Sequence, residues 1–144
     1  MIIHNHLHSK FKNISDTCCL ALTYLSLVYW AVINLDNDEL EIKVVGNLMK
    51  AALDDRNLLE DDATVADADK FIKYCTGIDV RVTKRKISSL SEIKEDEVAA
   101  VNYSYNGYNH WVGCIGPKVV YNSLEESKCL SLGKPVDARI IEIV

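Results

Sequence analysis

The sequence predicts an α+β domain in which helices come first and antiparallel strands follow. Residues 18–35 carry no charge and are long enough to form a helix that is buried on all sides. Apolar residues then recur at helical spacing between residues 39 and 75, and Gly77 offers a helix end. Beyond Gly77 apolar and polar residues alternate, which is typical of strands. Helices that precede the strands, rather than alternate with them, favour a helical layer packed on an antiparallel sheet.

The uncharged run CCLALTYLSLVYWAVINL is the predicted central helix, with its end near Asn34. Residues that favour the N-cap position precede the run: Asn13, Ser15, Asp16 and Thr17. The same residues 18–35 are also near the lower length limit for a membrane span. Because polar residues such as Thr23 and Ser26 interrupt the run, we expect a helix surrounded by protein and no membrane partner.

Two further helices are predicted before the strands begin. Residues 39–53 bring four apolar side chains onto one helical stripe: Leu40, Val44, Leu48 and Ala52. The acidic stretch 54–62 is predicted to be a loop, in which Asp61 or Asp62 caps a third helix that ends at Gly77.

The second half of the chain predicts five strands: residues 78–82, 98–105, 110–115, 119–121 and 139–144. Asn106-Gly107 and Gly116-Pro117 are strong turn signals between them. Residues 108–122 should therefore form a hairpin, in which Asn122 lies beside His110.

Composition limits the classes of function. A chain of 144 residues suits one domain, residues 1–144, and its net charge of −5 argues against nucleic acid as a partner. The five cysteines are odd in number and form no CxxC pair, which argues against a zinc site and suits a reducing cytoplasm. Alternating His4, His6 and His8 are better explained as an N-terminal arm than as metal ligands. We therefore expect neither metal nor cofactor, and a cytoplasmic location.

The candidate catalytic residues begin with a cysteine pair at the start of the central helix. Cys19 is the predicted nucleophile, because unpaired backbone N–H groups of a first turn stabilise a thiolate and can hold an oxyanion. Cys18 is the alternative nucleophile, and it points about 100° away around the helix. His110 is the predicted base, and Asn122 is predicted to orient its imidazole.

These positions together resemble the papain-like cysteine peptidases in the broad sense, including bacteriocin-processing peptidases and small bacterial relatives. The run from Cys19 to Thr23 is similar to the family's Cys, bulky, small, bulky, Ser or Thr. His110-Trp111-Val112 is similar to its His-bulky-Val run, and residues 119–123 to its strand that ends in Asn or Asp. Asn13 falls six residues before Cys19, where the family usually carries an oxyanion Gln.

The resemblance implies a papain-like fold and a thiol hydrolase that acts on a peptide or amide bond of a peptide or protein substrate. Asn13 would then be an oxyanion residue. The chain departs from the family pattern because the Gln is absent, and Cys18 as nucleophile would instead bring Ala21 into register with the bacteriocin-processing branch. The register of Asn13 and Thr23 favours Cys19. Two alternatives stay open: a catalytically inactive papain-like interaction module, and a membrane-anchored protein spanning at residues 18–35.

Overall fold

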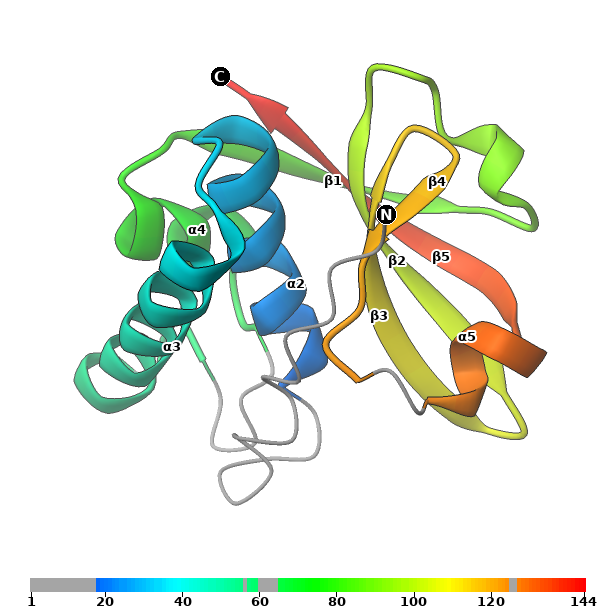
Figure 1. Cartoon of the computed structure of the whole chain (residues 1–144), viewed down its shortest axis with the longest axis horizontal. Coiled ribbons are helices and arrows are strands. Elements are labelled where there is room, and N and C mark those ends of the chain that lie inside the picture. The colour runs from blue at the N-terminus through cyan, green and yellow to red at the C-terminus, as the bar shows by residue number, and fades with distance from the viewer. Residues whose placement is uncertain (1–17, 56, 60–64, 125–126) are drawn as a thin grey trace.

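A computed structural model describes residues 18–55, 57–59, 65–124 and 127–144. Three helices, α2, α3 and α4, lie on one side of a sheet, and the short helix α5 lies on its other side (Figure 1). In the described residues the sheet has five strands in the order β1-β5-β2-β3-β4, and every neighbouring pair is antiparallel. The α+β prediction is confirmed.

The uncharged run forms α2 (Cys19–Leu27), which continues as the π-helical turn η1 (Val28–Val32). Asn34 then adopts a left-handed backbone conformation, with φ of 65°, and the chain turns away close to the predicted helix end. Every residue of α2 except Leu20 is buried, because α3 and α4 cover one face and the sheet covers the other (Figure 1). Among the described residues, no helix combines the length and apolar character that crossing a membrane requires.

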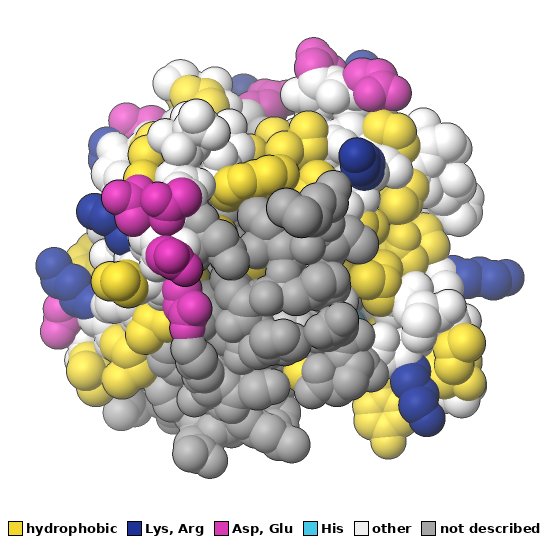
Figure 2. All heavy atoms as spheres, in the orientation of Figure 1, with side chains coloured by type: hydrophobic (Ala, Val, Ile, Leu, Met, Phe, Trp, Pro, Cys, Tyr) yellow, Lys and Arg dark blue, Asp and Glu magenta, His cyan; other side chains and the backbone are white. Residues whose placement is uncertain are grey.

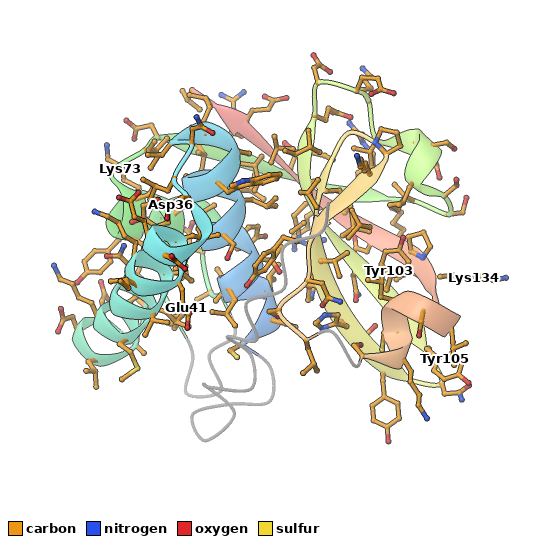
Figure 3. The ribbon with its side chains drawn as sticks, in the orientation of Figure 1. Asp36, Glu41, Lys73, Tyr103, Tyr105 and Lys134 are labelled. Atoms are coloured by element: carbon orange, nitrogen blue, oxygen red, sulfur yellow. The ribbon has the colours of Figure 1, made fainter. Side chains whose placement is uncertain are left out.

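The second predicted helix is α3 (Asn37–Asp54), whose N-cap Asp36 accepts a hydrogen bond of 2.8 Å from the Glu39 N–H. Acidic side chains gather over the start of α3 (Figure 2), and Figure 3 labels Asp36 and Glu41 among them. Negative charge at this end complements the helix dipole.

The third helix, α4 (Ala68–Thr76), begins later than predicted. Its N-cap is Asp67, which accepts a hydrogen bond of 3.2 Å from the Lys70 N–H, so the predicted caps Asp61 and Asp62 are wrong. The helix that buries Phe71 and Ile72 in the core begins only after Asp67, five residues beyond Asp62. The helix ends at Gly77 as predicted, with φ of 77°.

The strands are longer than the sequence suggested at several ends: β1 (Val80–Lys86), β2 (Val98–Tyr105), β3 (Tyr108–Ile115), β4 (Lys118–Tyr121) and β5 (Lys134–Ile143). Strand β5 pairs with both β1 and β2, and it begins five residues before the predicted Arg139. Pro135 obscured this start, but it sits where the register of β5 against β2 shifts, and such an irregularity tolerates proline. Helix α5 (Lys128–Leu132) was not predicted.

The sheet separates two apolar layers. Tyr24 and Leu27 of α2 and Val28 of η1 pack against the face that carries Ala100 and Ile141. The opposite face, with Val101, Val112 and Ala138 among its residues, packs against Cys129 of α5 and against Ile87 and Ile93. Gly113 lets α2 approach β3 closely, since a Cβ atom there would lie 2.7 Å from Leu27 Cδ2. This close approach holds the last turn of α2 against β3, the strand that carries His110.

An ion pair steadies the connection between β1 and β2. Arg85 donates to both carboxylate oxygens of Glu97, at 2.8 and 2.9 Å, and the Lys94 N–H donates to Glu97 as well. The Arg85 hydrogen bonds lower the pKa of Glu97 to about 2.

We expect Glu97→Gln to reduce the free energy of unfolding by about 1 kcal/mol at neutral pH, a value limited by the 35 % exposure of the Arg85 side chain. Because the folded pKa is depressed, the ion pair contributes fully above about pH 4.5 and is lost as the pH falls toward 2. Urea unfolding at several pH values measures the difference, which should shrink across that window. A constant difference would show that the carboxylate charge is not responsible.

Candidate active site

His110 and Asn122 lie together, as the predicted hairpin required. His110 belongs to β3, and Asn122 directly follows β4, which pairs with β3 around the Gly116-Pro117 turn. His110 Nε2 is 2.7 Å from Asn122 Oδ1, and the two residues are 3 % and 1 % exposed. Low exposure protects this hydrogen bond from competition by water.

A second hydrogen bond identifies which atom of the Asn122 side-chain amide faces His110. The backbone N–H of Leu124 donates to the same Asn122 oxygen at 3.0 Å. A backbone N–H can only donate, so this atom is the amide oxygen, and His110 Nε2 must donate to it as well. In the neutral imidazole the basic lone pair is therefore on Nδ1.

Cys19 starts α2 and lies against the strand residue that follows His110. The backbone N–H of Trp111 lies near the Cys19 thiol and acts to lower its pKa. The hydroxyl of Thr23, one helical turn further on, donates to the Cys19 carbonyl oxygen at 2.7 Å and lies 3.3 Å from the Trp111 carbonyl oxygen. β4 pairs with β3 only from Gly113 onward. At Trp111 the backbone of β3 therefore contacts α2 instead of β4.

Burial raises the pKa of the Cys19 thiol above its ordinary value. The backbone N–H groups of Trp111, Leu20 and Cys19 act in the opposite direction, but the loss of solvation is the larger effect. The sequence predicted a thiolate stabilised by the helix start. In the folded protein the same N–H groups are present, yet the neutral thiol is favoured.

The structure places the alternative nucleophile Cys18 away from this arrangement. Cys18 is fully buried in the core between α2, α3 and α4, where Leu22, Phe71 and Tyr121 are also found. Its side chain thus belongs to the helical core rather than to the surface of β3. Asn13, the predicted oxyanion residue, lies outside the described residues, as does the arm with His4, His6 and His8.

A cavity of about 470 Å³ opens beside His110, a volume within the range of small-molecule and peptide pockets. Its walls include Tyr105, Tyr108, Leu124 and Cys129, and Figure 3 labels Tyr105 beside α5. Sequence reasoning missed Cys129, which is 6 % exposed, because nothing in the sequence links the unpredicted helix α5 to His110. It also missed Trp111 and Leu124, which act through backbone N–H groups that every residue but proline possesses.

No three His, Cys, Asp or Glu side chains within the described ranges gather closely enough to hold a metal ion. Comparison of the chain with models of protein families, with curated proteins and with solved structures finds no match. The case for a function therefore depends on the geometry around His110.

Proposed function

We propose that this protein is a papain-like thiol hydrolase that cleaves a peptide or amide bond with Cys19, His110 and Asn122. The observation that supports this proposal most directly is the 2.7 Å hydrogen bond between His110 Nε2 and Asn122 Oδ1. The same oxygen also accepts a hydrogen bond from the Leu124 N–H. That contact gives the imidazole a fixed orientation and a basic Nδ1, two of the properties a general base requires.

The reaction begins when Cys19 Sγ attacks the substrate carbonyl carbon and His110 Nδ1 accepts the thiol proton. The raised pKa of Cys19 favours proton transfer during the attack over a preformed thiolate. Backbone N–H groups at the start of α2 stabilise the oxyanion, with Asn13 as the side-chain candidate from the sequence.

Collapse of the intermediate breaks the carbon–nitrogen bond. His110 returns the proton to the leaving amine, and a thioester remains on Cys19. A water molecule then attacks the thioester while His110 accepts a proton from it, and the released thiolate regains this proton. The products are an amine, a carboxylic acid and the free enzyme, and no metal or cofactor enters the balance.

One observation favours the second candidate, a papain-like interaction module without catalysis. Cys19 is only 6 % exposed, and burial favours its neutral, unreactive form. In such a module the cavity beside His110 would bind a peptide and release it unchanged.

Alkylation by iodoacetamide separates the two candidates, because the chain contains a matched thiol. Cys75 is 7 % exposed and its pKa is raised by burial to about 12, but it lies in the helical core away from His110. For a hydrolase we expect Cys19 to react at least about tenfold faster than Cys75 at neutral pH, since His110 assists loss of the proton. Mass spectrometry of the digested protein gives both rates, and equal rates would favour the module.

A further inference from the structure

Thr23 connects the helix that carries Cys19 to the strand that carries His110. Its side chain is fully buried, and its hydroxyl donates to the Cys19 carbonyl oxygen at 2.7 Å. The Trp111 carbonyl oxygen, 88 positions away in the sequence, shares the same hydroxyl proton at 3.3 Å. One hydroxyl thus contacts the residue proposed as nucleophile and the residue next to the proposed base.

This hydroxyl differs from an ordinary helical threonine. Thr76 in α4 also donates to the carbonyl four residues earlier, at 2.7 Å, which is a common local bond of threonine in helices. No described strand residue shares the Thr76 hydroxyl proton, whereas Thr23 reaches across to β3. The additional contact is the feature that a purely local role leaves unexplained.

Both polar backbone groups of Trp111 face the first turn of α2. Its carbonyl oxygen accepts from Thr23, and its N–H acts on the Cys19 thiol, whose pKa it lowers. The Trp111 ring is itself covered by the Arg139 guanidinium, 5.0 Å from the ring centre, and Arg139 pairs with Asp137 at 2.9 Å. Arg139 and Asp137 therefore help to hold Trp111 in place on β3.

We infer that Thr23 is a positioning residue that keeps Cys19 in register with His110, an inference that rests on the proposed function. The bond to the Cys19 carbonyl fixes the first helical turn, and the contact with Trp111 fixes that turn against β3. Proton transfer needs hydrogen-bond distances, so a displacement of about 1 Å at this junction slows the transfer severely.

The experiment is a double-mutant cycle between positions 23 and 110, read as the alkylation rate of Cys19. In the wild-type background, His110→Ala lowers this rate by a factor F. In the Thr23→Val background, which keeps the shape and removes the hydroxyl, F is expected to shrink by about tenfold. Thr23→Ser should preserve F, since it retains the hydroxyl.

Ser26→Ala is the matched control. Ser26 is a buried hydroxyl on the same helix, 1 % exposed, and its oxygen has no hydrogen-bond partner. Removing it should leave F unchanged. If Thr23→Val does not fold, Thr23→Ala and Thr23→Ser form the comparison, because those two variants differ only in the hydroxyl group.

The possible outcomes test the positioning role of Thr23 separately from the proposed hydrolase activity. A large F that is the same in all Thr23 variants overturns the positioning role and leaves the proposed hydrolase intact. An F close to one in the wild-type protein overturns the hydrolase, and the role of Thr23 falls with it. A smaller F in Thr23→Val, with F retained in Thr23→Ser and Ser26→Ala, supports both.

Discussion

The His110→Ala variant is expected to alkylate Cys19 with iodoacetamide roughly 100- to 1,000-fold more slowly than the wild-type protein near neutral pH. Burial favours the neutral form of this thiol, so its reaction depends on a base that accepts the proton during the attack. His110 supplies that base through Nδ1, because its Nε2 donates to Asn122. The rate is measured for Cys19 alone, from the mass of its peptide after digestion.

Two controls accompany this measurement. Cys75, which is comparably buried and lies in the helical core, should react at the same rate in both proteins. His110→Gln keeps a side-chain amide that can donate to Asn122 but lacks a basic nitrogen, so it should be as slow as His110→Ala. An unchanged Cys19 rate, or an equal decrease at Cys75, would contradict the proposed base.

Asn122→Ala is expected to lower the alkylation rate of Cys19 by roughly 100-fold, less than loss of the histidine itself. Without the amide oxygen, His110 loses the acceptor that fixes its ring and its tautomer, although the base remains present. The Leu124 N–H loses the same acceptor, so a modest decrease in thermal stability should accompany the effect.

Asn122→Asp tests whether the slower alkylation in Asn122→Ala comes from the lost orientation of His110 or from disturbed folding. A carboxylate accepts from both His110 and Leu124, so the geometry and most of the reactivity should be retained. Its negative charge stabilises the protonated imidazole, and the acid limb of the pH–rate profile should therefore move to higher pH. If Asn122→Asp is as slow as Asn122→Ala, or if its profile does not move, Asn122 does not orient the base.

Local patterns predicted the larger elements because those patterns reflect local physics. The uncharged run after the cysteine pair had to be buried, and it is α2 with η1. The Asn106-Gly107 turn adopts the positive φ values, 50° and 81°, that such a pair favours. The α4 cap was mispredicted because acidic residues of similar N-cap preference precede the helix, and the start of β5 was mispredicted because Pro135 lies inside the strand.

The sequence by itself determined the α+β class, the buried helix that begins at the cysteine pair, and the hairpin that brings Asn122 to His110. These follow from hydrophobic periodicity and turn residues, which act over a few positions. Only the tertiary structure decided that Cys18 enters the helical core while Cys19 lies against β3, and that Thr23 and Trp111 join the two layers. Adjacent helical residues point about 100° apart, so the orientation of the whole helix on the sheet decides which thiol faces the strand.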